Sequence, residues 1–126
     1  MTLSDYTKVG ELMEAYFEGL HQSDSFLLRT VFHPQMSYVC ATKDDELYLD
    51  LEAYMKRVDG REPPASRGDP RDEKILEIAF PDRRLAQVTA RMTMMGRDFL
   101  DVLTLVQASD GWRIVTKVFT YVARKD

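Results

Sequence analysis

The sequence predicts a single α+β domain over residues 1–126, in which helices come first and pack on a curved, mostly antiparallel sheet. Three observations predict this class. Apolar residues recur at helical spacing up to residue 60, and they alternate with polar residues from residue 72 onward. Two turn dipeptides, Gly96-Arg97 and Asp110-Gly111, separate the last alternating runs. A chain of this length buries enough apolar surface to fold without disulfides or metal.

The first helix is indicated by apolar residues at i, i+3, i+4, i+7, i+8 and i+11, which run from Val9 to Leu20 along one face. Gly10 and Gly19 each weaken this helix by about 1 kcal/mol relative to alanine. Packing of the apolar face therefore has to stabilise it.

Two shorter helices follow. Ser23 or Asp24 caps the second helix, and Pro34 ends it because proline lacks the backbone N–H that a helix needs. Asp50 caps the third helix, and Gly60 is the expected C-terminal stop.

Strands make up most of the remainder. Residues 36–41 and 46–49 predict a short hairpin, and residues 61–70, with three prolines and a glycine, predict a loop. Four long strands are expected afterwards, at residues 72–80, 84–95, 97–107 and 112–122.

The turn dipeptides predict which side chains face the core. With Gly96-Arg97 as a two-residue loop, Met95 pairs with Asp98. The inner face then holds Ala86, Val88, Ala90, Met92, Met94, Phe99, Asp101, Leu103 and Leu105. With Asp110-Gly111 as the next loop, the last strand adds Trp112, Ile114, Thr116, Val118 and Thr120 to this face, and Thr120 lies opposite Asp101.

A three-residue loop at 109–111 would turn the last strand over and place Lys117 and Phe119 inside. We favour the two-residue loop because it separates apolar from polar side chains better. The opposite, outer face remains too apolar for plain exposure to water, which predicts a homodimer formed sheet to sheet. This outer face is expected to hold Leu100, Val102, Thr104, Val106, Val115, Lys117, Phe119 and Tyr121.

The order of elements resembles that of the NTF2-like superfamily, and within it the family named putative lumazine-binding. The resemblance covers nearly the whole chain. The segments that carry it are YFEGL (16–20), VFHP (31–34), YMKRV (54–58), GREP (60–63), RGDPR (67–71), FLDVLTL (99–105) and GWRIVTKVF (111–119).

The resemblance implies a cone-shaped, cystatin-like domain with a pocket between helices and sheet, and a lumazine-like or other flat heterocyclic ligand. Relatives carry a bulkier polar residue such as asparagine at the position of Thr116, and histidine at the position of Thr120. Threonine is a poor general base, so this difference argues against a catalytic function of this chain.

Asp101 is the candidate catalytic residue. A carboxyl group buried in an apolar pocket has a raised pKa and can act as a base near neutral pH. Distant relatives in the superfamily, the ketosteroid isomerases, use an aspartate base of this kind. The alternative is a structural carboxylate that bonds a tyrosine, threonine or basic side chain.

The remaining candidates would line the ligand pocket around Asp101. Tyr16, Tyr38 and Tyr54 could give a flat heterocycle their hydroxyls and rings, and for them and Met92 the alternative is ordinary core packing. For His33 the alternative is a bond to the backbone at a helix end. Arg61 and Arg67 could clamp an anionic ligand, or could be solvated. The full predicted pocket set is Tyr16, His33, Tyr54, Met92, Phe99, Asp101, Trp112, Thr116 and Thr120.

Composition excludes several classes of site. Two histidines and one cysteine, Cys40, show no metal-ligand spacing, so we expect neither a metal nor a cofactor. The formal charge of −4 and scattered basic residues exclude a nucleic-acid surface, and no apolar run is long enough to span a membrane. The absence of signal-peptide features and the single cysteine predict a cytoplasmic protein.

Three functional hypotheses remain. The first is a small-molecule binding protein with the pocket described above. The second is an enzyme of the isomerase, cyclase or dehydratase type with Asp101 as general base. The third is a non-catalytic, dimeric interaction module that acts through the outer face of its sheet.

Overall fold

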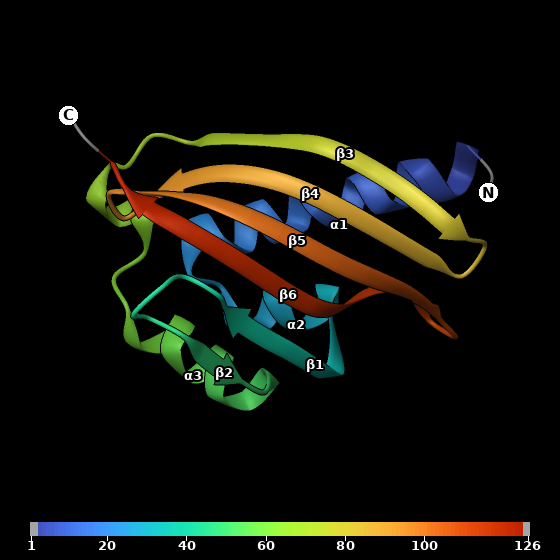
Figure 1. The fold of residues 1–126 in the computed structure, drawn as a ribbon, viewed down its shortest axis with the longest axis horizontal. Helices are drawn as coiled ribbons and strands as arrows, with labels where there is room; N and C mark the ends of the chain where they lie inside the picture. Colours follow the sequence, from blue (N-terminus) through green and yellow to red (C-terminus); the bar gives the residue numbers. More distant parts are fainter. Residues whose placement is uncertain (1–2, 125–126) are drawn as a thin grey trace.

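The computed structural model describes residues 3–124, and it confirms the predicted α+β class (Figure 1). The helices are α1 (Leu3–Gln22), α2 (Ser25–Val31) and α3 (Leu51–Gly60), with a 3₁₀ turn, η1 (Pro64–Arg67), in the segment that was predicted to be a loop. The strands are β1 (Phe32–Cys40), β2 (Leu47–Leu49), β3 (Asp72–Asp82), β4 (Leu85–Met94), β5 (Arg97–Ala108) and β6 (Gly111–Ala123).

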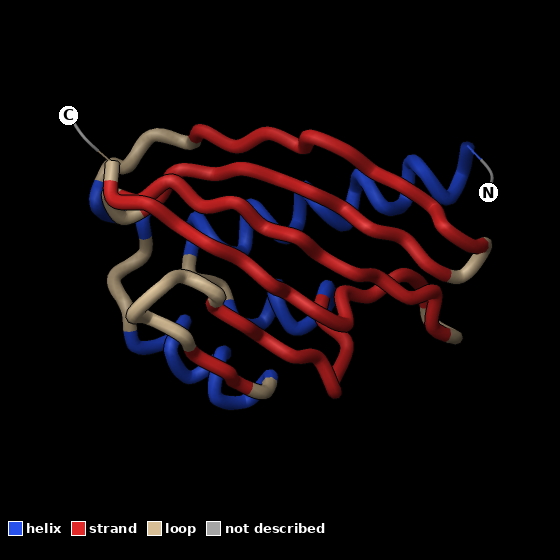
Figure 2. The backbone as a smooth tube through the Cα atoms, viewed as in Figure 1, coloured by secondary structure: helices blue, strands red, loops and turns tan. Residues whose placement is uncertain are grey.

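The described strands form one mixed sheet in the order β2-β1-β6-β5-β4-β3. All neighbours are antiparallel except β1 and β6, which run parallel. Helices α1 and α2 lie behind the sheet in Figure 1, while α3 lies beside β1 and β2 (Figures 1 and 2). The helices and the inner face of the sheet therefore enclose the core between them.

The two shorter helices begin where the sequence predicts. The side chain of Asp24 accepts a hydrogen bond of 3.0 Å from the backbone N–H of Leu27, and that of Asp50 accepts one of 2.8 Å from Ala53. Each aspartate satisfies a backbone donor that has no partner within its own helix.

The predicted apolar face of α1 is buried, and Gly19 on this helix packs closely against Leu28 of α2. A Cβ atom added at Gly19 would lie 2.6 Å from Leu28 Cδ2 and 2.7 Å from Leu28 Cγ, whereas one at Gly10 would meet nothing within 4 Å. Leu28 is fully buried, so its side chain has little room to move away.

We therefore expect opposite effects from the same substitution at the two glycines. Gly19→Ala should lower the free energy of unfolding by about 1–3 kcal/mol, because overpacking outweighs the gain in helix propensity. Gly10→Ala should raise it by up to about 1 kcal/mol. Urea unfolding of both variants is the measurement, and an equal gain at both positions would show that α1 and α2 are not tightly packed.

The predicted register between β4 and β5 is wrong by two residues. Met94 pairs with Arg97, so the loop is Met95-Gly96 rather than Gly96-Arg97. Both loop residues have positive φ, 55° and 71°, as a type I′ turn requires. Because side chains alternate with a period of two, this slip leaves the predicted faces unchanged, and Asp101 still points inward.

The predicted face of β6 is wrong for its second half. The loop is Ser109-Asp110, with Ala108 paired to Gly111, and Trp112 and Ile114 face the core as expected. The register then shifts: Leu105 pairs with Ile114 but Thr104 pairs with Thr116, which leaves Val115 as an extra residue. Such a β-bulge exchanges the two faces of a strand.

After the bulge, Lys117 and Phe119 are buried, while Val118 and Thr120 face outward. The predicted inner positions of Thr116, Val118 and Thr120 are therefore wrong, and so are the predicted outer positions of Lys117, Phe119 and Tyr121. The outer face keeps an apolar character through Leu85, Leu100, Val118 and Val122, which are 37–66% exposed.

Candidate functional site

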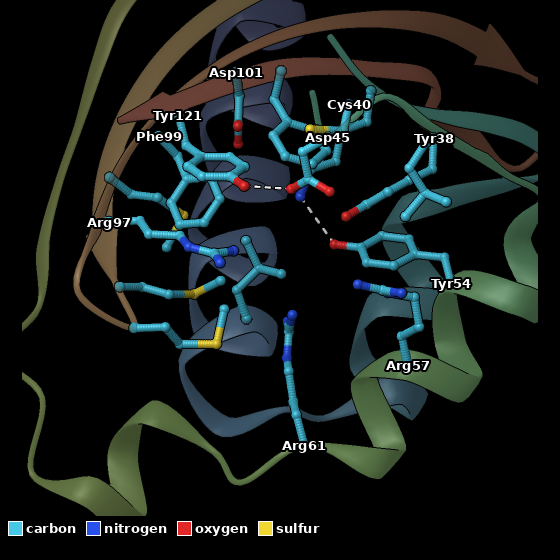
Figure 3. A pocket seen from close by; sticks show the side chains of 17 residues that line it. Tyr38, Cys40, Asp45, Tyr54, Arg57, Arg61, Arg97, Phe99, Asp101 and Tyr121 are labelled. Carbon is cyan, nitrogen blue, oxygen red and sulfur yellow. Dashed lines mark hydrogen bonds between the residues drawn. The ribbon is translucent and has the colours of Figure 1, made fainter. Parts of the chain in front are cut away.

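A cavity lies at the inner face of the sheet, between the C-terminal part of α1, the end of α3 and the β1–β2 hairpin (Figure 3). The volume of the cavity is about 80 Å³, and all free space between its lining side chains, which includes open solvent at its mouth, is about 630 Å³. It is lined by Leu20, Tyr38, Cys40, Asp45, Leu47, Tyr54, Arg57, Arg61, Met92, Met94, Met95, Arg97, Phe99, Asp101, Lys117, Phe119 and Tyr121.

Asp101 of β5 forms one side of the cavity floor and is only 2% exposed. Its Oδ2 atom accepts a short hydrogen bond from the hydroxyl of Tyr16, which α1 holds behind the cavity. Its Oδ1 atom is buried and has no hydrogen-bond partner in the part of the chain that the structure describes. A buried acceptor without a donor is costly, so this oxygen is suited to receive a hydrogen bond from a ligand.

Lys117 of β6 forms the other side of the floor. Its ammonium group is buried and lies 2.9 Å from the hydroxyl of Tyr54. Its Nζ atom is also 5.1 Å from the ring centres of Tyr16 and Tyr54, 5.7 Å from that of Tyr38 and 5.3 Å from that of Phe119. Aromatic faces attract a desolvated cation, so this cage compensates in part for the removal of Lys117 from water.

Burial and neighbouring charges shift the pKa values of two groups at this floor, the Tyr16 hydroxyl and the Lys117 ammonium. Burial, the negative charge of Asp101 and the hydrogen bond to it raise the pKa of the Tyr16 hydroxyl well above its ordinary value. Burial lowers the pKa of the Lys117 ammonium, but attraction to Tyr54, Asp101 and Tyr38 outweighs it, so the net pKa is raised. Tyr16 therefore stays protonated and Lys117 stays charged near neutral pH.

The mouth of the cavity carries three arginines. Arg57 lies in the last turn of α3, Arg61 directly follows this helix, and Arg97 is the first residue of β5 (Figure 3). The guanidinium of Arg97 lies 4.3 Å from the ring centre of Tyr121, whose hydroxyl donates a short hydrogen bond to Asp45.

The structure brings together five of the nine residues that the sequence proposed for the pocket. Tyr54, Met92, Phe99 and Asp101 line the cavity, and Tyr16 supports Asp101 from behind. The first four come from α3, β4 and β5, so their convergence follows from the alternation of β4 and β5 and from the helical spacing of α3.

The other four lie elsewhere. Thr116 and Thr120 are on the outer side of β6. His33 lies in β1, where its Nδ1 atom accepts a 3.0 Å hydrogen bond from the backbone of Gln35. Trp112 packs at the far end of β6, with its ring centre 5.8 Å from that of Phe80.

Sequence reasoning missed several lining residues, of which Lys117 matters most. The sequence did offer Lys117 and Phe119 through the alternative three-residue loop at 109–111, which places both on the inner face of the sheet. Tyr38 was a candidate to contact a flat ligand and Cys40 shares its face of β1, but the predicted pocket set included neither of them. Arg57 and Arg97 carried no signal, because charged residues at a helix end or a turn are usually solvated.

The described residues contain no group of three or more histidine, cysteine, aspartate or glutamate side chains placed to hold a metal ion. Among them, too, no helix has both the length and the apolar character needed to span a membrane.

A family model described as "Putative lumazine-binding" matches residues 4–120. The chain belongs to this family. A search of curated proteins gave no match, so the family relationship rests on the family model.

Solved structures of proteins described as NTF2-like or cystatin-like share the fold of this chain. An NTF2-like protein of unknown function from Silicibacter pomeroyi has 21% sequence identity and a TM-score of 0.80, covering 97% of this chain and 100% of the other. One from Methylobacillus flagellatus has 16% identity and a TM-score of 0.85, with 98% and 96% covered. A cystatin-like domain from Nostoc punctiforme has 14% identity and a TM-score of 0.76, with 100% and 80% covered.

Proposed function

We propose that this chain binds a small planar molecule, such as lumazine or another flat heterocycle, in the cavity between α1, α3 and the sheet. The observation that carries the proposal is the cavity floor, where Asp101 and Lys117, two buried groups of opposite charge, lie among aromatic rings. Ligand sites are typically apolar concavities with a few polar groups that fix the orientation of the ligand. The family description supports the same ligand class.

The size of the cavity indicates how such a ligand would enter. An engineered cavity of about 150 Å³ holds one benzene ring, so the cavity volume of about 80 Å³ is too small for two fused rings. The free space at the mouth is larger, and Arg57 and Arg97 there are exposed, flexible side chains. We therefore expect these two side chains to change conformation so that they border the bound ligand, while the buried floor stays in place.

Native mass spectrometry of the chain purified without refolding tests the proposal. We expect a fraction of the protein to carry a small molecule that is lost on denaturation, and lumazine added to ligand-free protein to bind in a titration. Leu47→Trp should abolish both by filling the mouth, whereas Tyr48→Trp should leave both unchanged. Leu47 lines the cavity, while Tyr48 on the same strand is 74% exposed. If the two variants behave alike, the ligand does not occupy this cavity.

A second candidate function is proton transfer by Asp101 in an isomerase, cyclase or dehydratase reaction. The observation that favours it is the buried Oδ1 atom of Asp101, a cavity-lining residue, because this atom has no hydrogen-bond partner among the described residues. Lys117 would stabilise negative charge that develops on a substrate after its proton is removed. Tyr16 would hold the carboxylate in position through Oδ2.

For an enzyme of this kind, Asp101→Asn should lower kcat by a factor of about 10²–10⁴, because the amide cannot accept the proton. Binding of the substrate should change far less, since asparagine keeps an acceptor oxygen for Tyr16. If Asp101→Asn turns over any substrate at the same rate as the unmodified chain, Asp101 is not the general base.

We also propose that the outer face of the sheet joins two copies of the chain. Exposed apolar residues on neighbouring strands support this, including Leu100 at 42%, Val118 at 37% and Val122 at 66%. Light scattering should give the mass of a dimer, and Val118→Glu should shift it to that of a monomer. A monomer at high concentration in the unmodified chain would overturn the proposal.

A further inference from the structure

The cavity has a charge opposite to that of the whole chain. The chain has a formal net charge of −4. Its cavity is lined by four cationic side chains, those of Arg57, Arg61, Arg97 and Lys117, against only two carboxylates. An excess of positive charge inside an acidic protein is costly unless it meets an anion, and it concentrates anions from solution.

None of the four cavity cations forms a salt bridge with a carboxylate in residues 3–124. Elsewhere, arginines pair with acids, as Arg29 does with Glu52 at 2.7 Å and Arg113 with Asp110 at 3.0 Å. The two acids of the cavity bond tyrosines instead: Asp101 accepts from Tyr16, and Asp45 from Tyr121. The cavity therefore keeps an excess of positive charge, because its four cations outnumber its two carboxylates and pair with neither of them directly.

Arg61 provides the sharpest indication of a ligand. Its Nε and Nη2 atoms are buried and have no hydrogen-bond partner among the described residues. Figure 3 shows its side chain entering the cavity from the side opposite Asp101. A guanidinium group offers two parallel N–H donors that match the two oxygens of a carboxylate. Leaving such donors buried and unbonded is costly, and a carboxylate would supply the missing acceptors.

The cavity walls between Arg61 and Asp101 favour a ligand with a flat ring. The ring centres of Tyr38 and Phe119 are 5.0 Å apart, those of Phe119 and Phe99 5.9 Å, and those of Phe99 and Tyr121 5.6 Å. Aromatic surfaces in this arrangement pack well against another ring. The unbonded Oδ1 atom of Asp101 would accept a hydrogen bond from an N–H or O–H group of that ring.

We propose that the ligand is a planar aromatic or heteroaromatic carboxylate, with its acid group on Arg61, between Arg57 and Arg97, and its ring against the aromatic wall. This inference rests on the proposed binding function and specifies its ligand class. A single negative charge fits better than a phosphate dianion, because Asp45 and Asp101 lie in the same cavity.

The position of Arg57 and Arg61 at the end of α3 offers a purely structural alternative, since cations stabilise the negative C-terminal end of a helix. That role predicts a loss of helix stability on substitution, without any effect on the choice of ligand. The two explanations therefore differ in a binding measurement rather than in a stability measurement.

The test compares the binding of two ring compounds, each as a carboxylate and as a neutral compound with the same ring. Isothermal titration calorimetry with lumazine-6-carboxylate against lumazine, and with 2-naphthoate against 2-naphthamide, gives the preference for the acid. For at least one pair we expect the carboxylate to bind tenfold or more tightly. Arg61→Gln should reduce this preference below threefold and change the affinity of the neutral partner less than twofold. Arg57→Gln should reduce the preference partly.

Lys56→Gln is the matched control, because it removes the same charge from α3 at an exposed residue outside the cavity lining, and it should keep the full preference. Thermal unfolding checks that each variant is folded. Equal affinity for both members of each pair would overturn this inference and leave the binding function intact.

If neither pair binds, the molecule carried by the purified protein decides: an aromatic acid supports the inference and a neutral molecule overturns it. The absence of any bound molecule in that case overturns the binding function as well.

Discussion

Lys117→Met is expected to lower the free energy of unfolding by about 3 kcal/mol at pH 7, because the buried carboxylate of Asp101 loses the attraction of the buried Lys117 ammonium. Removing one partner of a buried ion pair costs about 3–5 kcal/mol. The lower end applies here, since the two charges act on each other without direct contact and Asp101 keeps its bond to Tyr16. Methionine fills a similar volume, so the loss of charge rather than of packing determines the effect.

A double-mutant cycle separates this charge effect from packing. Asp101→Asn in the Lys117→Met background should restore part of the lost stability, since the buried carboxylate is then gone. Urea unfolding at pH 7 gives the free energies, and unchanged m-values would show that the unfolded state is not altered. If Lys117→Met is as stable as the unmodified chain, the aromatic cage rather than Asp101 balances Lys117.

Most of the fold could be predicted because its signals are local. The bounds of the four long strands lie within two residues of the predicted ones, and Asp24 and Asp50 act as the expected N-caps. Each of these features depends on a few neighbouring residues. The parallel pairing of Ser37 in β1 with Thr116 in β6 joins segments far apart in the chain, so no local pattern predicts it.

The site could be predicted only in part because it depends on the register of β6. Trp112 and Ile114 before the bulge, and Lys117 and Phe119 after it, all face inward, which an unbroken strand does not allow. The favoured register was thus right for the first half of β6, and the alternative register was right for the second. The extra residue, Val115, sits in an ordinary apolar run, which gives no sign of a bulge.

The structure does offer a context for this bulge. The pairing of β1 with β6 is interrupted at the same level, between Phe32 and Ser37, in the segment that contains Pro34. Proline cannot donate a hydrogen bond to a neighbouring strand, so regular pairing fails there and the adjoining strand is free to bulge. The chemistry of the cavity thus depends on a local irregularity, through the side of β6 on which Lys117 emerges.

Tyr16→Phe is expected to lower the free energy of unfolding at pH 7 by about 1.5–3 kcal/mol, the contribution of a hydrogen bond to a charged group. Without the hydroxyl, both oxygens of the buried Asp101 carboxylate lack a donor. Tyr48→Phe, which removes a hydroxyl from a 74% exposed residue, is the matched control at this pH and should cost far less.

The same variant should also change how stability depends on alkaline pH. Burial and Asp101 raise the pKa of Tyr16, so the unfolded chain releases this proton near pH 10 while the folded chain retains it. Between these two pKa values the folded state binds more protons, and stability falls by about 1.4 kcal/mol per pH unit. Lys117 acts in the same direction, because its folded-state pKa is also raised.

In Tyr16→Phe the part of the slope that comes from Tyr16 disappears, while the part from Lys117 remains. Urea unfolding of both proteins at several pH values from 7 to 11 measures the two slopes. We expect the curves to converge above pH 10, because the unmodified chain loses there the advantage that it holds at pH 7. Parallel curves over the whole range would mean that Tyr16 ionises as easily in the folded chain as in the unfolded one, and that the floor of the cavity is open to water.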